Sequence, residues 1–304
     1  MSSPHKKILV VLVGPTAVGK TAHCIALAQH FGTEIVSSDS RQVYREMTIG
    51  TAVPSTDELS AVKHHLIQHK SIFAPYNASM FEQEALETIK KIHQRYDIVL
   101  ATGGSGLYVD TLCHGIDELP DTDPQLRKEL REDFEKNGIE SLRRKLKKLD
   151  PDHYKRVDLK NHQRILKALE VTLSTGKPYS TYLTRSKAER PFHIIKLGLN
   201  MDRSVLHERI ATRVDQMMEA GLLEEAKELF PHRELNALNT VGYRELFDFI
   251  EEKIPLEKAV ELIKRNTRRY ARKQISWFSR DVRMHWFAPE NVKETIAFIE
   301  KQLK

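Results

Sequence analysis

Apolar and polar positions divide the first third of the chain into short buried strands that alternate with helices. An uninterrupted apolar run from Ile8 to Val13 predicts a strand over Lys6–Val13 that is buried on both faces. Shorter runs predict strands at Glu34–Ser37 and Asp97–Thr102, and the second of these follows an amphipathic helix over Ser79–Tyr96. Strands that alternate with helices in this way predict a parallel sheet with right-handed crossovers.

The middle of the chain has a different pattern. From about Asp117 to Lys187 we find no strand-like run, only charge-rich stretches of helical periodicity. Those stretches predict helices at Gln125–Lys136, Glu140–Leu149 and His162–Thr175. We therefore expect an inserted all-helical lobe over residues 117–190 and a core formed by residues 1–116 and 191–304.

Strands and helices alternate again after the expected lobe. His193–Leu199 predicts a buried strand, and Met284–Phe287 predicts a short final one. Helical periodicity covers Ser204–Ile250 and Leu256–Phe278. These elements extend the predicted α/β core on the far side of the insertion.

Composition limits the class of protein and its compartment. The chain has 304 residues, of which 40% are apolar and 30% charged, and this balance is typical of a folded globular protein. Its longest apolar run, Ile8–Val13, is far shorter than the roughly 18 residues of a membrane span. The first residues lack the pattern of a secretory signal, so we expect a cytoplasmic protein. Cys24 and Cys113 lie far apart without metal-ligand spacing, and we interpret both as small buried apolar residues.

Positive charge is concentrated in two regions. The net charge of the whole chain is +6; it is zero over residues 1–116, +5 over residues 117–196 and +1 over residues 197–304. Within the last third, the segment Ile263–Arg283 carries eight basic residues against Asp281 alone. Two cationic regions favour a polyanionic partner such as nucleic acid, although a charge run is often only a solvated helix face.

A phosphate-binding motif follows the first strand. Residues Gly14–Thr21 read GPTAVGKT, which fits GxxxxGK[ST] between an apolar strand and a helix that begins near Thr21. In such a loop the backbone N–H groups and the helix N-terminus face an anion, Lys20 supplies a positive charge, and the Thr21 hydroxyl can bind phosphate or its Mg²⁺. The predicted fold class is therefore α/β, with a P-loop NTPase-like, mostly parallel sheet flanked by helices.

The acid that an ATP-hydrolysing enzyme places at the end of a neighbouring strand is missing, because DIVLAT runs into Gly103, Gly104 and Ser105. A carboxylate follows the second strand instead, where Asp39 should lie at the carboxyl edge of the sheet near the phosphate loop. Asp39 is a candidate base or metal ligand, and its structural alternative is a helix N-cap. Two other functions stay open here: a small-metabolite kinase that uses Lys20 and Thr21, and a non-enzymatic RNA-binding module.

Several motifs in order make the chain resemble the tRNA dimethylallyltransferases, also called tRNA isopentenyltransferases, of the bacterial type. The resemblance runs from about Lys7 to Phe287 and rests on these motifs: GPTAVGKT, SSDSRQVYREMTIGTAVP, GGSGLY, RIATRVDQMMEAGLLEE, TVGYRE and RRYARKQISWF. It implies transfer of the dimethylallyl group of dimethylallyl diphosphate to N6 of adenosine 37, in tRNAs that read codons beginning with U. The implied cofactor is Mg²⁺, with Thr21 as its ligand.

The resemblance also implies a role for individual residues. Asp39, Ser105 and Arg213 would be catalytic: Asp39 takes a proton from the amine, while Ser105 and Arg213 steady the diphosphate. The family's usual Thr in GGTGLY is Ser105 here, which keeps the hydroxyl and loses the methyl. The diphosphate-binding residues would be Gly14, Pro15, Thr16, Ala17, Val18, Gly19, Lys20 and Thr21.

The implied tRNA contacts come from two regions, the DSRQ stretch and the helical lobe, which would clasp the anticodon stem-loop. The contacts would be Asp39, Ser40, Arg41, Gln42, Ser105, Arg127, Gln163, Arg164 and Lys167. The chain departs from the family pattern at three positions: Lys167 replaces an Arg, Val53 replaces a Lys, and Gln68 replaces an Asp. His64 is a weaker site candidate, because such a histidine is more often structural. With no exposed apolar stripe in the sequence, we expect a monomer.

Overall fold

The computed structural model describes residues 7–184 and 188–303. The chain divides into two compact units, which are described separately. One unit comprises Met1–His114 and Glu189–Lys304, and the other is Gly115–Ala188. The expected lobe of residues 117–190 overlaps the second unit, and its residues 185–187 lie outside the described residues.

The first unit is built on a six-stranded sheet with the order β3-β2-β4-β1-β5-β6, in which every neighbouring pair is parallel. The strands are β1 (Ile8–Val13), β2 (Ile35–Ser37), β3 (His64–His65), β4 (Ile98–Gly103), β5 (His193–Leu199) and β6 (His285–Phe287). The parallel sheet and five of these strands confirm the sequence prediction. The pattern missed β3, because a two-residue strand defined by its pairing with β2 is too short to show a periodicity.

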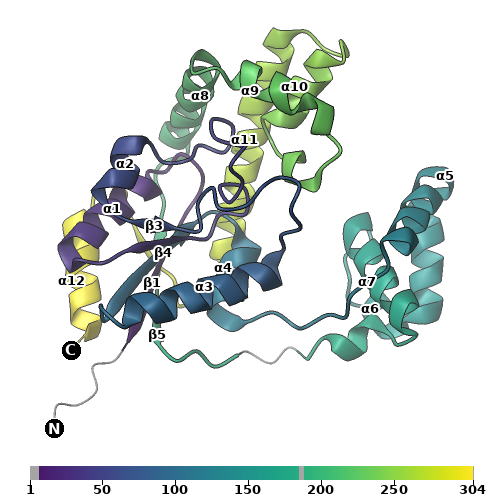
Figure 1. Cartoon of the computed structure of the whole chain (residues 1–304), viewed down its shortest axis with the longest axis horizontal. Helices are drawn as coiled ribbons and strands as arrows, with labels where there is room; N and C mark the ends of the chain where they lie inside the picture. Colours follow the sequence, from purple (N-terminus) through teal and green to yellow (C-terminus); the bar gives the residue numbers. More distant parts are fainter. Residues whose placement is uncertain (1–6, 185–187, 304) are drawn as a thin grey trace. The chain divides into compact units, whose positions relative to one another are not determined.

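Strand β1, in the interior of the sheet, is buried on both faces. All six residues of β1 are buried, and its alternate residues Ile8, Val10 and Leu12 pack in a core cluster with Leu27 of α1 (Lys20–Phe31). Helix α12 (Val292–Leu303) lies beside α1 and contributes Ile299 to the same cluster (Figure 1). A continuous apolar run such as β1 is what a parallel strand covered by helices on both sides requires.

Further helices complete the first unit. They are α2 (Thr56–Ala61), α3 (Ala78–His93), α4 (Gly106–His114), α8 (Arg203–Glu219), α9 (Leu222–Leu229), α10 (Tyr243–Ile250) and α11 (Leu256–Phe278). Helices α9 and α10 and the first half of α11 surround a separate apolar cluster that includes Leu222, Tyr243 and Ile263. The predicted helices over Ser204–Ile250 and Leu256–Phe278 are thus confirmed, the first of them as several shorter elements.

The second unit is a small helical bundle. It consists of α5 (Pro124–Leu149), α6 (Pro151–Tyr154), α7 (His162–Thr175) and the short 3₁₀ turn Tyr179–Tyr182, and no strand occurs among its described residues. Two helices expected at Gln125–Lys136 and Glu140–Leu149 form one helical span with a kink at Gly138, whose φ of 70° is left-handed. Leu142, Ile165 and Leu169 form its core.

Cys24 and Cys113 are buried free thiols, and burial raises their pKa to about 12 and about 11. Both therefore stay protonated and act as packing residues, as the sequence suggested. None of the helices in the described ranges is both long and apolar enough to cross a bilayer.

Candidate functional site

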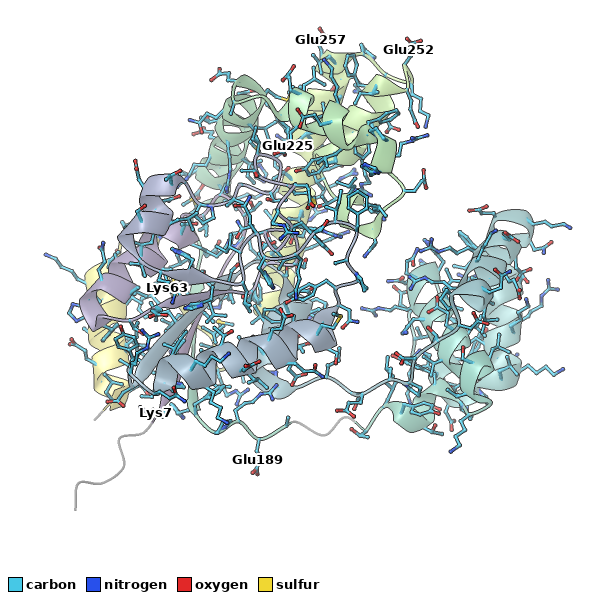
Figure 2. The ribbon with its side chains drawn as sticks, in the orientation of Figure 1. Lys7, Lys63, Glu189, Glu225, Glu252 and Glu257 are labelled. Carbon is cyan, nitrogen blue, oxygen red and sulfur yellow. The ribbon has the colours of Figure 1, made fainter. Side chains whose placement is uncertain are left out.

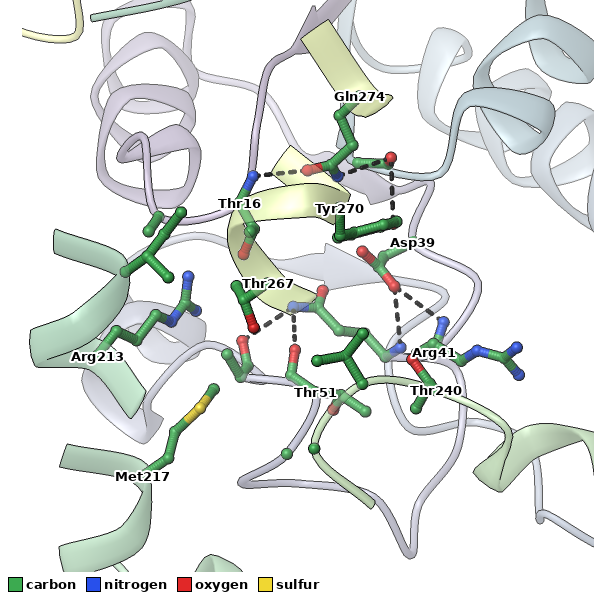
Figure 3. A pocket seen from close by; sticks show the side chains of 18 of the residues that line it. Thr16, Asp39, Arg41, Thr51, Arg213, Met217, Thr240, Thr267, Tyr270 and Gln274 are labelled. Atoms are coloured by element: carbon green, nitrogen blue, oxygen red, sulfur yellow. Dashed lines mark hydrogen bonds between the residues drawn. The ribbon is translucent and has the colours of Figure 1, made fainter. Parts of the chain in front are cut away.

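A pocket of about 600 Å³ opens at the carboxyl ends of β1, β2 and β4 (Figure 3). Six parts of the first unit contribute most of its lining: the phosphate-binding loop, the segment that follows β2, the segment that follows β4, helix α8, helix α11, and the segment before α10. Carboxyl ends of parallel strands are where open α/β sheets bind ligands. The polar residues of the lining include Thr16, Lys20, Thr21, Asp39, Ser40, Arg41, Gln42, Thr51, Arg213, Thr240, Arg244, Thr267, Arg269, Lys273 and Gln274.

The loop Gly14–Thr21 connects β1 to α1 and wraps the start of that helix. Gly14 approaches the backbone of β5 so closely that a Cβ on it would lie 2.7 Å from the carbonyl oxygen of Leu199. Gly19 caps α1 with a φ of 103°, a conformation that a side chain would strain. The two glycines of the motif therefore permit a backbone path that directs the N-terminus of α1 toward the pocket.

Lys20 is the cation of this loop. Its Nζ atom donates to the carbonyl oxygens of Gly14 and Pro15, at 3.0 and 2.8 Å. Burial lowers the pKa of Lys20 to about 8; the nearby charge of Asp39 opposes this effect and that of Arg213 adds to it. A lysine that is desolvated in this way gains more from a bound anion than an exposed lysine does.

Asp39 follows β2 and shares the pocket with Lys20, as the sequence predicted. Its Oδ1 atom accepts hydrogen bonds from the backbone N–H groups of Arg41 and Gln42, at 2.8 and 3.4 Å. Within the described residues the hydrogen bonds of this carboxylate go to Oδ1 (Figure 3). The turn therefore fixes the carboxylate and leaves Oδ2 as its available oxygen.

Ser105 lies beside this turn rather than on the pocket wall. Its Oγ accepts from the backbone N–H of Ser40 at 2.9 Å and lies 3.0 Å from the Ser40 hydroxyl, to which it donates. The pocket lining includes Gly103 and Gly104 of the same loop but not Ser105. In this structure Ser105 therefore ties the loop after β4 to the loop after β2.

Arg213 enters the pocket from α8. Burial lowers its pKa, whereas the carboxylates of Asp39 and Glu58 favour its charged form. Arg209, one turn earlier, brings a guanidinium nitrogen within 3.5 Å of the point where a Cβ on Gly19 would lie. Helix α8 thus directs two arginines toward the phosphate-binding loop, and Arg213 is the one that the family resemblance implied.

Gln274 of α11 bridges two loops of the site, and sequence reasoning did not assign it a role. Its Oε1 accepts from the backbone N–H of Thr16 at 2.8 Å, and its Nε2 donates to the carbonyl oxygen of Gly104 at 2.9 Å (Figure 3). The side chain is buried. Its position in the motif RRYARKQISWF, and its polar character on the buried face of a helix, were the available signals.

A second missed residue, Glu225, holds the loop at Thr48–Ala52. Its carboxylate accepts from the backbone N–H groups of Thr48, Ile49 and Gly50 at 2.8 to 3.0 Å, and from the Tyr243 hydroxyl at 2.6 Å. Figure 2 labels this side chain on α9, next to the loop. Gln42 anchors the same loop from its other side, because its Nε2 donates to the carbonyl oxygens of Thr51 and Ala52.

The four predicted residues of the helical lobe lie in the second unit. Arg127 of α5 and Lys167 of α7 both reach Glu170, at 3.2 and 3.9 Å, and Glu170 is buried. Gln163 and Arg164 lie exposed in the first turn of α7. Arg127 and Lys167 therefore share one buried carboxylate in the middle of α7.

Other expected residues lie away from the pocket wall. Pro15 and Val18 of the phosphate loop are buried, and Val18 packs in the core cluster beneath the loop. His64 lies on β3, with Nδ1 2.8 Å from the carbonyl oxygen of Val62, and does not line the pocket. Gln68 donates to the Thr48 hydroxyl, which ties two loops together.

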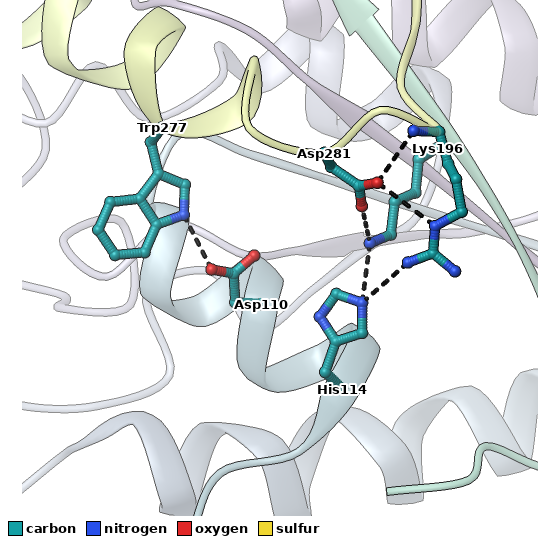
Figure 4. A network of polar contacts seen from close by, with 6 residues as sticks. Asp110, His114, Lys196, Trp277 and Asp281 are labelled. Carbon is teal, nitrogen blue, oxygen red and sulfur yellow. Dashed lines mark hydrogen bonds and ion pairs between the residues drawn. The ribbon is translucent and has the colours of Figure 1, made fainter. Parts of the chain in front are cut away.

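A separate polar network lies between α4, β5 and the end of α11 (Figure 4). The buried Lys196 of β5 contacts Asp281 at 2.5 Å and His114 at 3.0 Å. The indole N–H of Trp277 donates to Asp110 of α4 at 2.9 Å. These contacts hold α11 on α4, and so they support the helix that carries Gln274.

The oxygen ligands available for a metal are few. Among the described residues no group of three or more His, Cys, Asp or Glu side chains could hold an ion. Thr21 and Asp39 nevertheless both line the pocket. One or two protein oxygens are enough for a Mg²⁺ ion that is bound mainly through substrate phosphates and water.

The fold and the pocket together define a class of protein: an α/β protein whose phosphate-binding loop shares one pocket with a carboxylate that follows another strand of the same sheet. Residues 42–281 match a family model described as IPP transferase. The chain belongs to this IPP transferase family, and so it is a transferase.

Close relatives and solved structures agree with the family. The chain is 52% identical over 286 residues to tRNA dimethylallyltransferase 2 of Azobacteroides pseudotrichonymphae, covering 94% of this chain and 93% of that protein. It is 46% identical to tRNA dimethylallyltransferase 1 of Bacteroides fragilis, covering 98% and 99%.

Among solved structures, the full-length tRNA isopentenylpyrophosphate transferase of Bacillus halodurans matches with a TM-score of 0.73 and 36% identity, covering 98% of this chain and 97% of that chain. A eukaryotic dimethylallyltransferase described as acting on tRNA matches with a TM-score of 0.74 and 30% identity, covering 89% and 69%. These similarities confirm the P-loop NTPase-like fold, and they do not favour the kinase or the RNA-binding alternative.

Proposed function

We propose that this chain transfers the dimethylallyl group of dimethylallyl diphosphate to N6 of adenosine 37 in tRNAs that read codons beginning with U. One observation carries the proposal: a single pocket contains the phosphate-binding loop with Lys20, the guanidinium of Arg213 and the carboxylate of Asp39. The full-length relatives named tRNA dimethylallyltransferase support it. The reaction needs a site for a diphosphate next to a base for an amine, and the residue types that line this pocket are suited to both roles.

The leaving group of this reaction is diphosphate. As the allylic C1–O bond breaks, its electron pair passes to the diphosphate, whose negative charge increases. The N-terminus of α1, Lys20 and Arg213 all direct positive charge into the pocket, so they stabilise this charge as it develops. Arg213 can contact two phosphate oxygens at once because its guanidinium is planar.

The nucleophile is the exocyclic amine of adenine, which is weak because its lone pair is delocalised into the ring. As the new N6–C1 bond forms, the amine must lose one proton. Asp39 is suited to accept this proton through Oδ2, because Oδ1 is held by the backbone of Arg41 and Gln42. Because a stacked base cannot reach a pocket, the target nucleotide has to be flipped out of the anticodon loop.

Mg²⁺ is the expected cofactor. The Thr21 hydroxyl would hold it together with the diphosphate oxygens, in the way that phosphate loops usually use this residue. The ion supplies further positive charge to the leaving group when it is bound. Lys20, Arg213 and the loop backbone provide the remaining neutralisation from this chain.

Recognition of the anticodon stem-loop is assigned to exposed and half-buried polar residues of both units, most of them cations. Arg127, Gln163, Arg164 and Lys167 belong to the helical unit, with Arg41 and Gln42 at the pocket. Ser105 supports the Ser40 turn from behind. Such contacts read the phosphates and the shape of the RNA more than its sequence. The monomeric state and the cytoplasmic location remain predictions.

The function is tested with purified full-length protein, unmodified tRNA and dimethylallyl diphosphate. We expect a tRNA nucleoside that is heavier by one dimethylallyl group, and we expect the Asp39→Asn variant to lose this product while it still retains tRNA. Unchanged tRNA together with consumption of ATP in the presence of small acceptors would instead favour the kinase alternative.

A further inference from the structure

One wall of the pocket carries apolar residues from α8, the start of α9 and α11, which pack in or against one apolar cluster. We propose that this wall, here called the apolar floor and formed by Val214, Met217, Leu222 and Ile263, receives the hydrocarbon tail of the donor, and that Met217 limits the length of tail that is accepted. This inference rests on the proposed function, because it assigns the donor's tail to a part of the same site.

Three of the four floor residues belong to a packed core. Val214, Leu222 and Ile263 are 2%, 0% and 2% exposed, and they pack in one cluster with Tyr243. Met217 is only partly buried and packs against this cluster from the pocket side. A packed interior does not accept additional atoms without a cost in free energy, so the floor is closed to a longer chain.

The spacing of residues along α8 matches a short amphiphile. Arg209, Arg213 and Met217 follow one another at intervals of four residues, which is about 6 Å along a helix axis. Arg209 lies beside Gly19 of the phosphate loop, and Arg213 lies near Lys20. A donor whose diphosphate is held by this loop therefore meets the apolar floor within about one helical turn.

The opposite wall of the pocket is polar and does not suit a hydrocarbon. It contains Asp39, Arg41 and Thr240, which Figure 3 shows on the side away from Arg213 and Met217. The amine of the acceptor base has to approach Asp39, so this wall is assigned to the nucleobase. The donor's tail is thus left with the α8 side, where its burial is favourable.

Met217 is the floor residue whose side chain can be changed with the least effect on the packed core, because it is only partly buried. Its unbranched, flexible thioether can fit closely against a small branched group. A methionine at such a position also tolerates substitution, so the size of this side chain can be changed in a variant. Replacing it with Ala removes three heavy atoms at the end of the pocket that faces the tail. Met218 offers a matched control, because it is also partly buried against the same cluster but does not line the pocket.

The experiment measures kcat/KM for three donors on unmodified tRNA: dimethylallyl diphosphate, and homologues whose terminal methyl is extended by one or two methylenes. We expect the unaltered chain to discriminate by about 10- to 200-fold against each added methylene. In Met217→Ala we expect the selectivity against the first methylene to fall by at least about tenfold, with the KM for tRNA unchanged. Met218→Ala should keep the original selectivity.

A substitution in the other direction protects the test against loss of folding. Met217→Phe adds volume to the floor, and we expect it to lower kcat/KM for dimethylallyl diphosphate by about tenfold or more while tRNA binding is retained. Equal losses for all three donors in Met217→Ala, a raised KM for tRNA, or the same change in Met218→Ala would overturn the inference alone. An unaltered chain that transfers no prenyl group refutes the proposed function as well.

Discussion

The Gln274 side chain offers a direct test of how the phosphate loop is held. It connects the backbone N–H of Thr16 to the carbonyl oxygen of Gly104, two groups on different loops of the pocket. Replacing it with Ala removes both hydrogen bonds at once, so the half-buried Thr16 N–H loses this acceptor and the Gly104 carbonyl keeps only the longer 3.5 Å bond from the Tyr270 hydroxyl. Leaving such a group unsatisfied costs about 1 to 3 kcal/mol.

The magnitude follows from that cost. Without Gln274 the phosphate loop can move to find another hydrogen-bond partner, and it then no longer holds the diphosphate in the best position. If the whole cost appears as lost transition-state stabilisation, about 1 to 3 kcal/mol corresponds to roughly a 5- to 150-fold decrease in kcat/KM for the donor. Gln274→Glu is the more selective variant, because it keeps an acceptor for Thr16 and places a second oxygen against the Gly104 carbonyl. We expect it to be impaired although its shape is unchanged.

The assay is steady-state prenylation of tRNA, with the donor varied at saturating tRNA, together with tRNA binding by the same variants. A defect in the loop should appear in kcat/KM for the donor and leave the affinity for tRNA within about twofold of the original. If both Gln274 variants transfer the prenyl group with an unchanged kcat/KM, the bridge does not position the phosphate loop and the reasoning fails.

Three further predictions follow from the same site. Because the pKa of Lys20 is about 8, its charge is present below that pH and lost above it, so kcat/KM for the donor should fall as the pH rises through 8, whereas Lys20→Arg should not show this fall. Glu225→Gln should lower the free energy of unfolding by about 1 to 3 kcal/mol in denaturant titrations, and Tyr243→Phe, which removes one of the four bonds, should cost less. The affinity for tRNA should decrease steadily with salt as counterions are released, and an affinity that is flat from low to moderate salt contradicts the assigned cationic contacts.

The parts of the site that are contiguous in sequence could be predicted from it. Residues Ile8–Val13, the GPTAVGKT loop and the start of α1 form one strand, loop and helix, and each carries a local signature. Asp39 could be placed near the loop because its strand, although not adjacent to β1, ends at the same edge of a parallel sheet. Local pattern and sheet topology were sufficient for these residues.

Residues that act through long-range contacts could not be found in this way. Gln274 contacts Thr16 across 258 positions, and Glu225 reaches Gly50 across 175 positions. Each lies on a helix whose amphipathic pattern is predictable, but the pattern gives no indication of which loop the helix faces. Met217 had no chemical signal at all, because a partly buried methionine on a helix is most often a packing residue.

The GGSGLY motif shows why a motif residue can have a structural role beside the one its family suggests. A Cβ on Gly104 would lie 2.2 Å from Nε2 of Gln274, and a Cβ on Gly106 would lie 2.6 Å from the ring of Trp277. Both glycines therefore allow α11 to approach the loop, and the bond from Trp277 to Asp110 holds it there. The two motifs GGSGLY and RRYARKQISWF are far apart in sequence, yet each depends on the other's residues. A side chain at Gly104 or Gly106 would consequently displace α11, and through Gln274 it would disturb the phosphate loop, although Gly106 itself does not line the pocket.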